Sequence, residues 1–263
     1  MGKSSQGNVS NIGENLKKYL LGVKIDDVNV GQAVQIVETW LEKSEKHYIV
    51  TPNPEFLVDA QNDPEFKKIL NEADLSIPDG IGLRINTDIV CNTPGIDLME
   101  ELIKMAAEKA VTVGFLGGRD EVAEKAAERL QKKYPKLKVT LATSGGVIQN
   151  EVKDLSRMRV SNKLRDSSAS PQNDIKIPPT DLLFVAFGHP KQEKWIVENL
   201  DKIPVRVAMG VGGSFDYISG RVPRAPLLIR KLMLEWLFRL VIQPWRIKRQ
   251  LKLLKYLWLV MIH

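Results

Sequence analysis

Short apolar runs alternate with longer segments of helical periodicity along most of the chain. The runs are rich in valine, isoleucine and leucine, which favours buried strands. Six strands are predicted on this pattern, over residues 47–51, 75–77, 111–116, 138–142, 181–187 and 205–209. Helices are expected between them, over residues 54–72, 95–110, 120–133, 150–165 and 191–202. Such alternation is typical of βαβ units around a parallel sheet.

The pattern predicts three regions. We expect a Rossmann-like α/β domain, a mostly parallel sheet flanked by helices, over residues 20–220. A polar tail at 1–19 precedes it, and a C-terminal basic amphipathic helical appendage follows at 221–263. The polar, proline-containing segment 167–180 has no periodicity and is predicted to be a surface loop. With 263 residues, 43% of them hydrophobic, the chain can bury one sizeable core with a small addition.

Polar or glycine-containing loops follow five of the predicted strands. Ligands of open α/β sheets bind beyond the carboxyl ends of the strands, so these loops are expected to meet at one crevice. They lie at residues 51–53, 78–80, 117–118, 188–190 and 210–213.

Asp79, in the segment IPDGIG, directly follows an apolar run. A carboxylate in this position suits a general base. Asp-Gly is also a common turn pair, so a purely turn-capping role stays open. Gln192, in GHPKQEKWI, is a ligand candidate because its amide both donates and accepts. A solvated helix start accounts equally well for the neighbouring Lys191.

The glycines of residues 210–213 precede Ser214, Phe215 and Asp216. Such a loop can bring backbone amides close to phosphate or ribose oxygens, although a tight strand-to-helix turn predicts the same residues. The full GxGxxG fingerprint is absent, which disfavours a nicotinamide enzyme.

Composition narrows the chemistry and the compartment. Cys91 is the single cysteine, which excludes an internal disulfide and a cysteine-built zinc site. The three histidines are scattered and no Asp-x-Asp triplet occurs, so neither a metal site nor a cofactor is predicted. The polar start lacks the apolar core of a secretory signal, and no run approaches the roughly 20 apolar residues of a membrane span. We therefore expect a cytoplasmic protein.

The net charge of +6 is concentrated at the C-terminus. From residue 221 onward ten lysines and arginines stand against one acid, Glu235. They are interleaved with leucine and tryptophan at near-helical spacing, which is typical of helices that lie on an anionic membrane surface. An ordinary amphipathic helix packed on the core or on another subunit is the alternative. Pro244 is expected to separate two helices.

Several motifs in order support a more specific interpretation. They are TPN at 51–53, IPDGIG at 77–82, GIDLM at 95–99, FLGG at 115–118, AFGHPKQEKWI at 186–196, MGVGGSFDYISG at 209–220, RAP at 224–226 and EWLFRL with QPWR beyond. Together they resemble the WecG/TagA/CpsF glycosyltransferase family from about residue 20 to the end. The resemblance implies inverting, metal-independent transfer of N-acetylmannosamine from UDP to undecaprenyl-diphosphate-linked GlcNAc, as in wall teichoic acid linkage units. A related branch transfers N-acetylmannosaminuronic acid.

The resemblance also implies roles for individual residues. Asp79 falls on the catalytic base, Thr51 and Asn53 on the donor pocket, and Gln192 on a second active-site position. The glycine loop, with Gly212 and Gly213, and Asp216 correspond to the part that receives the nucleotide, while Gly188 and Lys191 are expected to bind substrate. The appended segment contributes Arg221 and Arg224, which are expected to stabilise the diphosphate leaving group in place of a metal. The partners would be a UDP-sugar, a polyprenyl-diphosphate-GlcNAc acceptor and the inner membrane surface.

One departure from the family pattern leaves alternatives open. Between IPDGIG and GIDLM the chain reads LRINTDIVCNTP, which is shorter than usual and lacks an expected arginine unless Arg84 replaces it. A catalytically inactive nucleotide-sugar-binding scaffold is therefore one alternative. A basic nucleic-acid-binding protein is another, but it would not need the glycine loops. The oligomeric state is left open, with a homo-oligomer among the alternatives.

Overall fold

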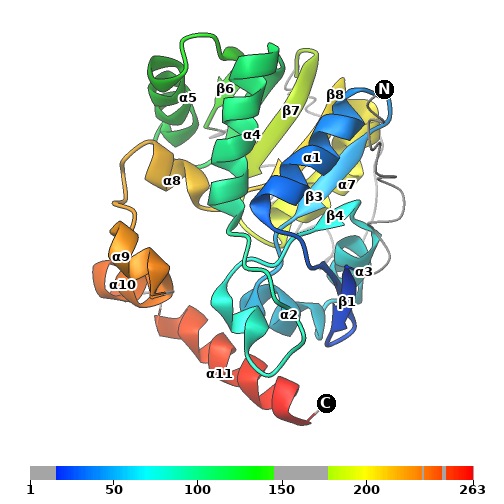
Figure 1. The fold of residues 1–263 in the computed structure, drawn as a ribbon, viewed down its shortest axis with the longest axis vertical. Coiled ribbons are helices and arrows are strands. Elements are labelled where there is room, and N and C mark those ends of the chain that lie inside the picture. The colour runs from blue at the N-terminus through cyan, green and yellow to red at the C-terminus, as the bar shows by residue number, and fades with distance from the viewer. Residues whose placement is uncertain (1–15, 145–176, 233, 245–246, 263) are drawn as a thin grey trace, which may run out of the picture. The chain divides into compact units, whose positions relative to one another are not determined.

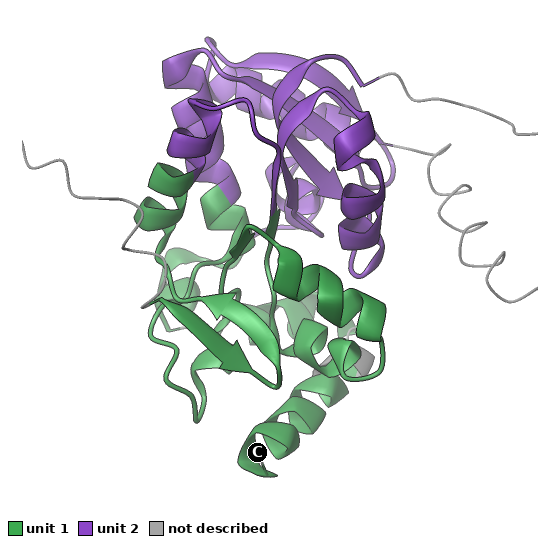
Figure 2. Cartoon of the chain, turned by 90° about the vertical axis from the view of Figure 1, so that its right-hand side faces the viewer, with its two compact units in different colours: residues 1–36, 49–98, 225–263 green, residues 37–48, 99–224 purple. Residues whose placement is uncertain are grey.

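A computed structural model of the protein describes residues 16–144, 177–232, 234–244 and 247–262 (Figure 1). The chain divides into two compact units (Figure 2). We call residues 1–36, 49–98 and 225–263 unit 1, and residues 37–48 and 99–224 unit 2.

A six-stranded sheet with the strand order β4-β3-β8-β7-β5-β6 forms the frame of the fold. The ladders β3/β4, β5/β6, β5/β7 and β7/β8 are all parallel. The apolar runs predict all six strands with ends shifted by a single residue, which confirms the Rossmann-like α/β class. The strands are β3 (His47–Val50), β4 (Leu75–Ser76), β5 (Thr112–Gly117), β6 (Lys138–Thr143), β7 (Thr180–Ala186) and β8 (Val205–Gly210).

The core of unit 2 lies around β5, β7 and β8. These strands are almost wholly buried, as expected for parallel strands covered on both faces. Helix α5 (Val122–Lys133) contacts β5 and β6, and α7 (Lys191–Asn199) contacts β7 and β8. Each fully buried Leu, Val or Phe side chain contributes about 1.5–3 kcal/mol, so this packing holds the strand ends in fixed positions. Helix α8 (Ser214–Ile218) also belongs to unit 2, whereas α4 (Gly95–Lys109) starts in unit 1 and ends in unit 2.

The described part of unit 1 begins with a hairpin of β1 (Lys17–Leu20) and β2 (Val23–Asp26). Its turn residues Leu21 and Gly22 have φ of 52° and 74°, the left-handed conformation that two-residue hairpin turns need. Helix α1 (Val30–Leu41) follows. The hydrophobic pattern predicted neither the hairpin nor α1.

The predicted helix over residues 54–72 is wrong, because two helices occupy this stretch. They are α2 (Pro54–Ala60) and α3 (Pro64–Glu72). Pro64 cannot continue a helix but suits the first turn of a new one, and the Asp63 side chain caps it by accepting from Phe66 N at 3.0 Å. The stretch predicted as one helix over residues 191–202 forms α7 and, directly after it, a 3₁₀ turn, η3 (Leu200–Lys202). The predicted helix 150–165 and most of the loop 167–180 lie outside the described residues.

Three helices form the described C-terminal part, namely α9 (Leu227–Lys231), α10 (Glu235–Ile242) and α11 (Ile247–Ile262). Pro244 lies between α10 and α11, as predicted. Within unit 1, α11 packs on α2, where Tyr256 is fully buried and Lys252 Nζ lies 2.8 Å from Asp59 Oδ2. None of the helices in the described ranges combines the length and the hydropathy of a membrane span.

Candidate active site

A cavity of about 260 Å³ in unit 2 is built at the carboxyl ends of β5, β7 and β8. Three of the five predicted loops line it, at Gly118, at Gly188 and at Gly212 and Gly213. Gly118 has a φ of 84°, and a Cβ there would lie only 2.2 Å from Val122 Cγ2, so this position requires glycine. The cavity is further lined by Arg119, Val122, Ala186, Phe187, Lys191, Phe215, Asp216 and Arg221.

Gln192 lies beneath this cavity rather than in it. Its side chain is 1% exposed, and its Oε1 accepts from the backbone N–H groups of Gly188 at 3.2 Å and Gly212 at 3.0 Å. Its Nε2 donates to Glu193 Oε1 at 2.7 Å. Gln192 therefore connects two of the pocket loops, and the Gly212 amide that was expected to face a ligand is bonded to it.

The two arginines predicted for the diphosphate have different surroundings in unit 2. Arg221 lines the cavity and pairs with Asp120 at 2.6 Å and with Asp216 at 3.7 Å. Arg224 is not among the lining residues and pairs with Glu100 at 3.8 Å. Because Arg221 is nearly half exposed, its pairs are weak, and its guanidinium can turn to an anion in the cavity.

Asp79 lies in unit 1, after β4, where the loops following β3 and β4 meet. Its backbone N–H donates to Pro52 O at 2.9 Å, and its carboxylate accepts from the backbone N–H of Gly95, the first residue of α4. A Cβ on Gly95 would lie 3.1 Å from Thr51 Cγ2 and 3.6 Å from Asp79 Oδ2. Thr51, Asp79 and Gly95 thus lie close together at the N-terminus of α4. The helix dipole favours a negative charge at this position.

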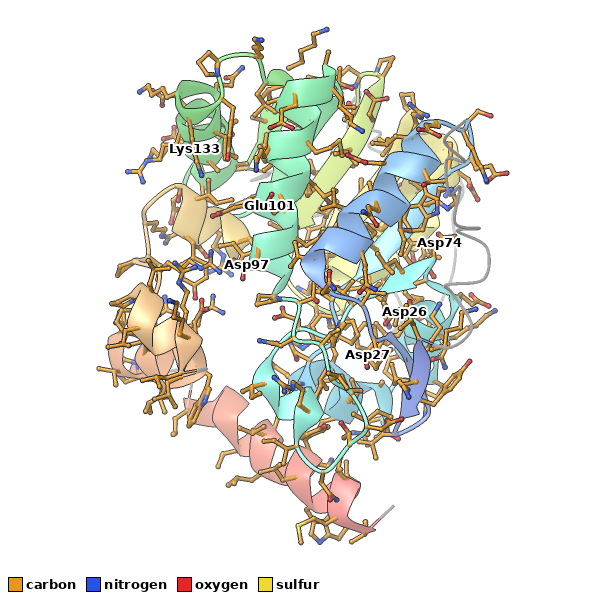
Figure 3. The ribbon with its side chains drawn as sticks, in the orientation of Figure 1. Asp26, Asp27, Asp74, Asp97, Glu101 and Lys133 are labelled. Atoms are coloured by element: carbon orange, nitrogen blue, oxygen red, sulfur yellow. The ribbon has the colours of Figure 1, made fainter. Side chains whose placement is uncertain are left out.

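Burial raises the pKa of Asp79 to about 7 and outweighs several smaller influences. The Gly95 hydrogen bond and the positive charge of Arg239 lower this pKa, whereas the negative charges of Glu235 and Asp97 raise it. Asp97 lies in the first turn of α4 and is labelled in Figure 3. A carboxyl group that titrates near neutral pH is suited to taking and releasing a proton.

Asn53 has a structural role as a helix cap, which was not predicted from the sequence. Its Oδ1 caps α2 by accepting from Glu55 N at 2.9 Å and Phe56 N at 3.1 Å. Only its amide nitrogen is left for a ligand. Thr51 is buried, and its side chain lies close to Gly95, which also approaches the carboxylate of Asp79.

The short segment after Asp79 is held by specific hydrogen bonds within unit 1. It begins with a 3₁₀ turn, η2 (Ile81–Arg84). Gly80 N donates to Asn92 Oδ1 at 2.9 Å, and Thr93 N donates to Pro78 O at 2.8 Å. Cys91 N donates to Asp27 Oδ1 at 2.7 Å, which ties the segment to the end of β2, where Figure 3 labels Asp27. The shortened loop thus retains a defined conformation around Asp79.

Comparison with known proteins identifies the family. The glycosyl transferase WecG/TagA/CpsF family matches residues 18–263. The chain belongs to this family. It is 33% identical over 230 residues to the N-acetylglucosaminyldiphosphoundecaprenol N-acetyl-beta-D-mannosaminyltransferase of Bacillus spizizenii, covering 86% of this chain and 82% of the relative. The enzyme of the same description from Staphylococcus aureus is 32% identical over 240 residues, which is 89% of this chain and 87% of the relative.

Membership of the WecG/TagA/CpsF family makes the chain a glycosyltransferase and confirms the resemblance derived from its motifs. Three functional candidates were not predicted from the sequence. Glu235 and Arg239 occur in the motif EWLFRL, where their four-residue spacing places both on one helix face. Glu193 adjoins Gln192 in sequence, and only the structure reveals that it is buried.

Proposed function

We propose that this glycosyltransferase moves N-acetylmannosamine from UDP-N-acetylmannosamine to undecaprenyl-diphosphate-linked GlcNAc, with inversion and without a metal. The relatives' names supply the sugar and the acceptor. The observation that carries the chemical part is the position of Asp79, whose carboxylate lies at the N-terminus of α4 with a pKa near 7.

Asp79 is the general base of the proposed reaction. The acceptor's sugar hydroxyl must lose its proton as its oxygen attacks the anomeric carbon, and the ionised Asp79 carboxylate takes that proton. The C–O bond to the acceptor then forms on the face opposite the departing UDP, which inverts the anomeric centre. Gly95 N–H and the charge of Arg239 stabilise the ionised carboxylate before the transfer.

The cavity of unit 2 binds the nucleotide in this proposal. Lys191 and Arg221 supply positive charge, and Asp216 is an acceptor for the uridine. Negative charge builds on the diphosphate as the sugar leaves, and Arg221 stabilises it in the role that a metal has in other glycosyltransferases. The acid pair Glu55 and Asp59 on α2 is bonded to Lys252, whose single positive charge offsets part of the negative charge of the two carboxylates.

The exposed face of α11 supports attachment to the inner membrane surface. Ile247, Leu251, Leu254, Trp258 and Met261 recur at three- and four-residue intervals and are each at least half exposed. The buried Tyr256 and Val260 lie on the face that packs in unit 1. An apolar stripe beside lysines is suited to insertion among anionic headgroups, where each cation contributes about 1 kcal/mol.

The test is product identification with purified protein. The protein is incubated with a soluble polyprenyl-diphosphate-GlcNAc analogue and, in separate reactions, UDP-N-acetylmannosamine, UDP-N-acetylmannosaminuronic acid and UDP-GlcNAc. Transfer of N-acetylmannosamine with inverted anomeric configuration is expected, and Asp79→Asn serves as the negative control. Transfer of only the uronic acid would move the chain to the other branch of the family, and hydrolysis or binding without transfer would indicate a scaffold.

A further inference from the structure

Glu193 is a fully buried acid that the proposed chemistry does not use. It lies in the first turn of α7 with 0% exposure. One oxygen, Oε1, accepts from Gln192 Nε2 at 2.7 Å, while the other, Oε2, has no hydrogen-bond partner among the described residues. A buried carboxyl group with half of its bonding capacity unused is costly, which calls for a functional reason.

The hydrogen bond to Glu193 determines which way the Gln192 amide points. Oε1 of Glu193 can only accept, so it selects the NH₂ end of the amide. The amide oxygen must then face the opposite side, where Gly188 N–H and Gly212 N–H both donate to it. A flipped amide would place its NH₂ group against two N–H donors and leave both glycine amides unpaired.

The two glycines define the cavity of unit 2 from two different strand ends. Gly188 follows β7 and Gly212 follows β8, and both line the cavity. The end of β8 is packed against the pair directly, because a Cβ on Gly210 would lie 2.7 Å from Gln192 Nε2 and 3.0 Å from Glu193 Oε1. A single amide oxygen therefore fixes the spacing of two loops against an already rigid strand.

We propose that Glu193 is a positioning residue for nucleotide binding, which orients Gln192 so that its amide oxygen holds the Gly188 and Gly212 loops in the spacing that the UDP moiety requires. The proposal deepens the proposed function, since it rests on the assignment of this cavity to the nucleotide. Burial raises the pKa of Glu193 to about 7, which agrees with the geometry. In the protonated form the proton resides on the unpartnered Oε2, and Oε1 still accepts from Gln192.

This role predicts which substitutions are tolerated. Glu193→Gln retains a carbonyl oxygen in the place of Oε1, so it should rescue the orientation of Gln192. Glu193→Leu has a similar volume but no acceptor. We expect Glu193→Leu to weaken UDP binding about tenfold or more and to raise KM for the UDP-sugar by a similar factor, with KM for the acceptor within about twofold of wild type. Glu193→Gln should stay within about twofold of wild type in each quantity.

Titration calorimetry with UDP, supported by steady-state kinetics, tests the proposal. Asp181→Asn is the matched control, because Asp181 lies at the start of β7 in unit 2 and bonds to Thr112 and Arg206 away from the cavity. This control should lower the melting temperature while leaving the Kd for UDP unchanged. Gln192→Leu tests the same role if Glu193→Leu does not fold. It should weaken UDP binding to the same extent. The double variant should lose no more affinity than either single one.

The outcomes separate this inference from the proposed function. A wild-type protein that does not bind UDP would overturn both. If wild type binds UDP and the leucine variants bind it equally well, Glu193 and Gln192 do not position the loops, and the proposed function stands. If Glu193→Gln is as impaired as Gln192→Leu, the acceptor role assigned to Oε1 is wrong.

Discussion

The carboxylate of Asp79 accepts a hydrogen bond from the backbone N–H of Gly95, at the first residue of α4. This contact joins the loop after β4 to a helix N-terminus and holds the proposed base in one orientation. Asp79→Asn retains the size of the side chain but cannot accept a proton. We expect its kcat to fall by about 10²- to 10⁴-fold, with the Kd for UDP nearly unchanged because the cavity of unit 2 is untouched. Near-normal turnover, measured with the soluble acceptor, would remove Asp79 from this role.

The charges around Asp79 predict a pH profile. With a pKa near 7, the base is ionised only on the alkaline side, so kcat/KM should rise with pH and level off above about pH 7. Arg239→Gln removes a charge that lowers this pKa, and the rising limb should shift to higher pH. Glu235→Gln removes a charge that raises it and should shift the limb the other way, by a smaller amount. Identical limbs in the two variants would show that Asp79 is not the titrating group.

Asp79 also predicts a pH-dependent difference in stability. Its pKa is raised from 3.8 in the unfolded chain to about 7 in the folded protein, so the folded state binds the extra proton between these values. Stability attributable to Asp79 is therefore retained below pH 4 and lost as the pH rises to 7. Asp79→Asn avoids this loss. Its free energy of unfolding relative to that of wild type should therefore rise by on the order of 1–3 kcal/mol from pH 4 to pH 8. Asp88→Asn, at an exposed carboxylate, is the control and should show no such gain.

The sequence predicted the frame of the fold better than the contacts of the site. Parallel strands buried on both faces leave continuous apolar runs, and all six were found to within one residue. The β1/β2 hairpin is short, and its polar residues Lys17, Lys18, Lys24 and Asp26 interrupt the apolar signal. The sequence does contain a signal for the break between α2 and α3. Asp63 is a helix-capping residue, and Pro64 cannot continue a helix.

Long-range relationships were beyond the sequence pattern. Arg239 influences Asp79 from 160 positions further along the chain, and no periodicity encodes that proximity. Asn53 and Gln192 were found as polar residues at strand ends, but their hydrogen bonds to backbone groups of α2 and of the glycine loops depend on the folded geometry. The family resemblance identified the residue types, and the structure shows which of them bind backbone and which line a cavity.

Metal independence makes a direct prediction. If Arg221 and its neighbours compensate the charge on the leaving diphosphate, activity should survive excess EDTA within about twofold. Arg221→Gln should lower kcat by about 10²-fold, and added Mg²⁺ or Mn²⁺ should not restore it. An EDTA-treated wild type that regains its rate only with a divalent ion would defeat the metal-free mechanism.

The exposed stripe on α11 predicts a separation of membrane binding from catalysis. Leu254 and Trp258 are 64% and 60% exposed, while Tyr256, between them in sequence, is fully buried. Replacing Leu254 and Trp258 by serine removes apolar surface available to a bilayer without opening the core. We therefore expect binding to vesicles of acidic lipid to fall about tenfold or more, with turnover of a soluble acceptor within about twofold of wild type.

Tyr256→Ser is the matched control, because it removes the same kind of apolar surface from the opposite face of α11. It should lower the melting temperature of the protein through a cavity inside unit 1, while the exposed stripe remains intact. Cosedimentation with vesicles, thermal unfolding and turnover are measured for both variants. If the Leu254 and Trp258 double variant binds vesicles as wild type does but fails to self-associate, the stripe is an interface between subunits. If it loses turnover of the soluble acceptor to the same degree as vesicle binding, α11 contributes to catalysis and is not only a membrane anchor.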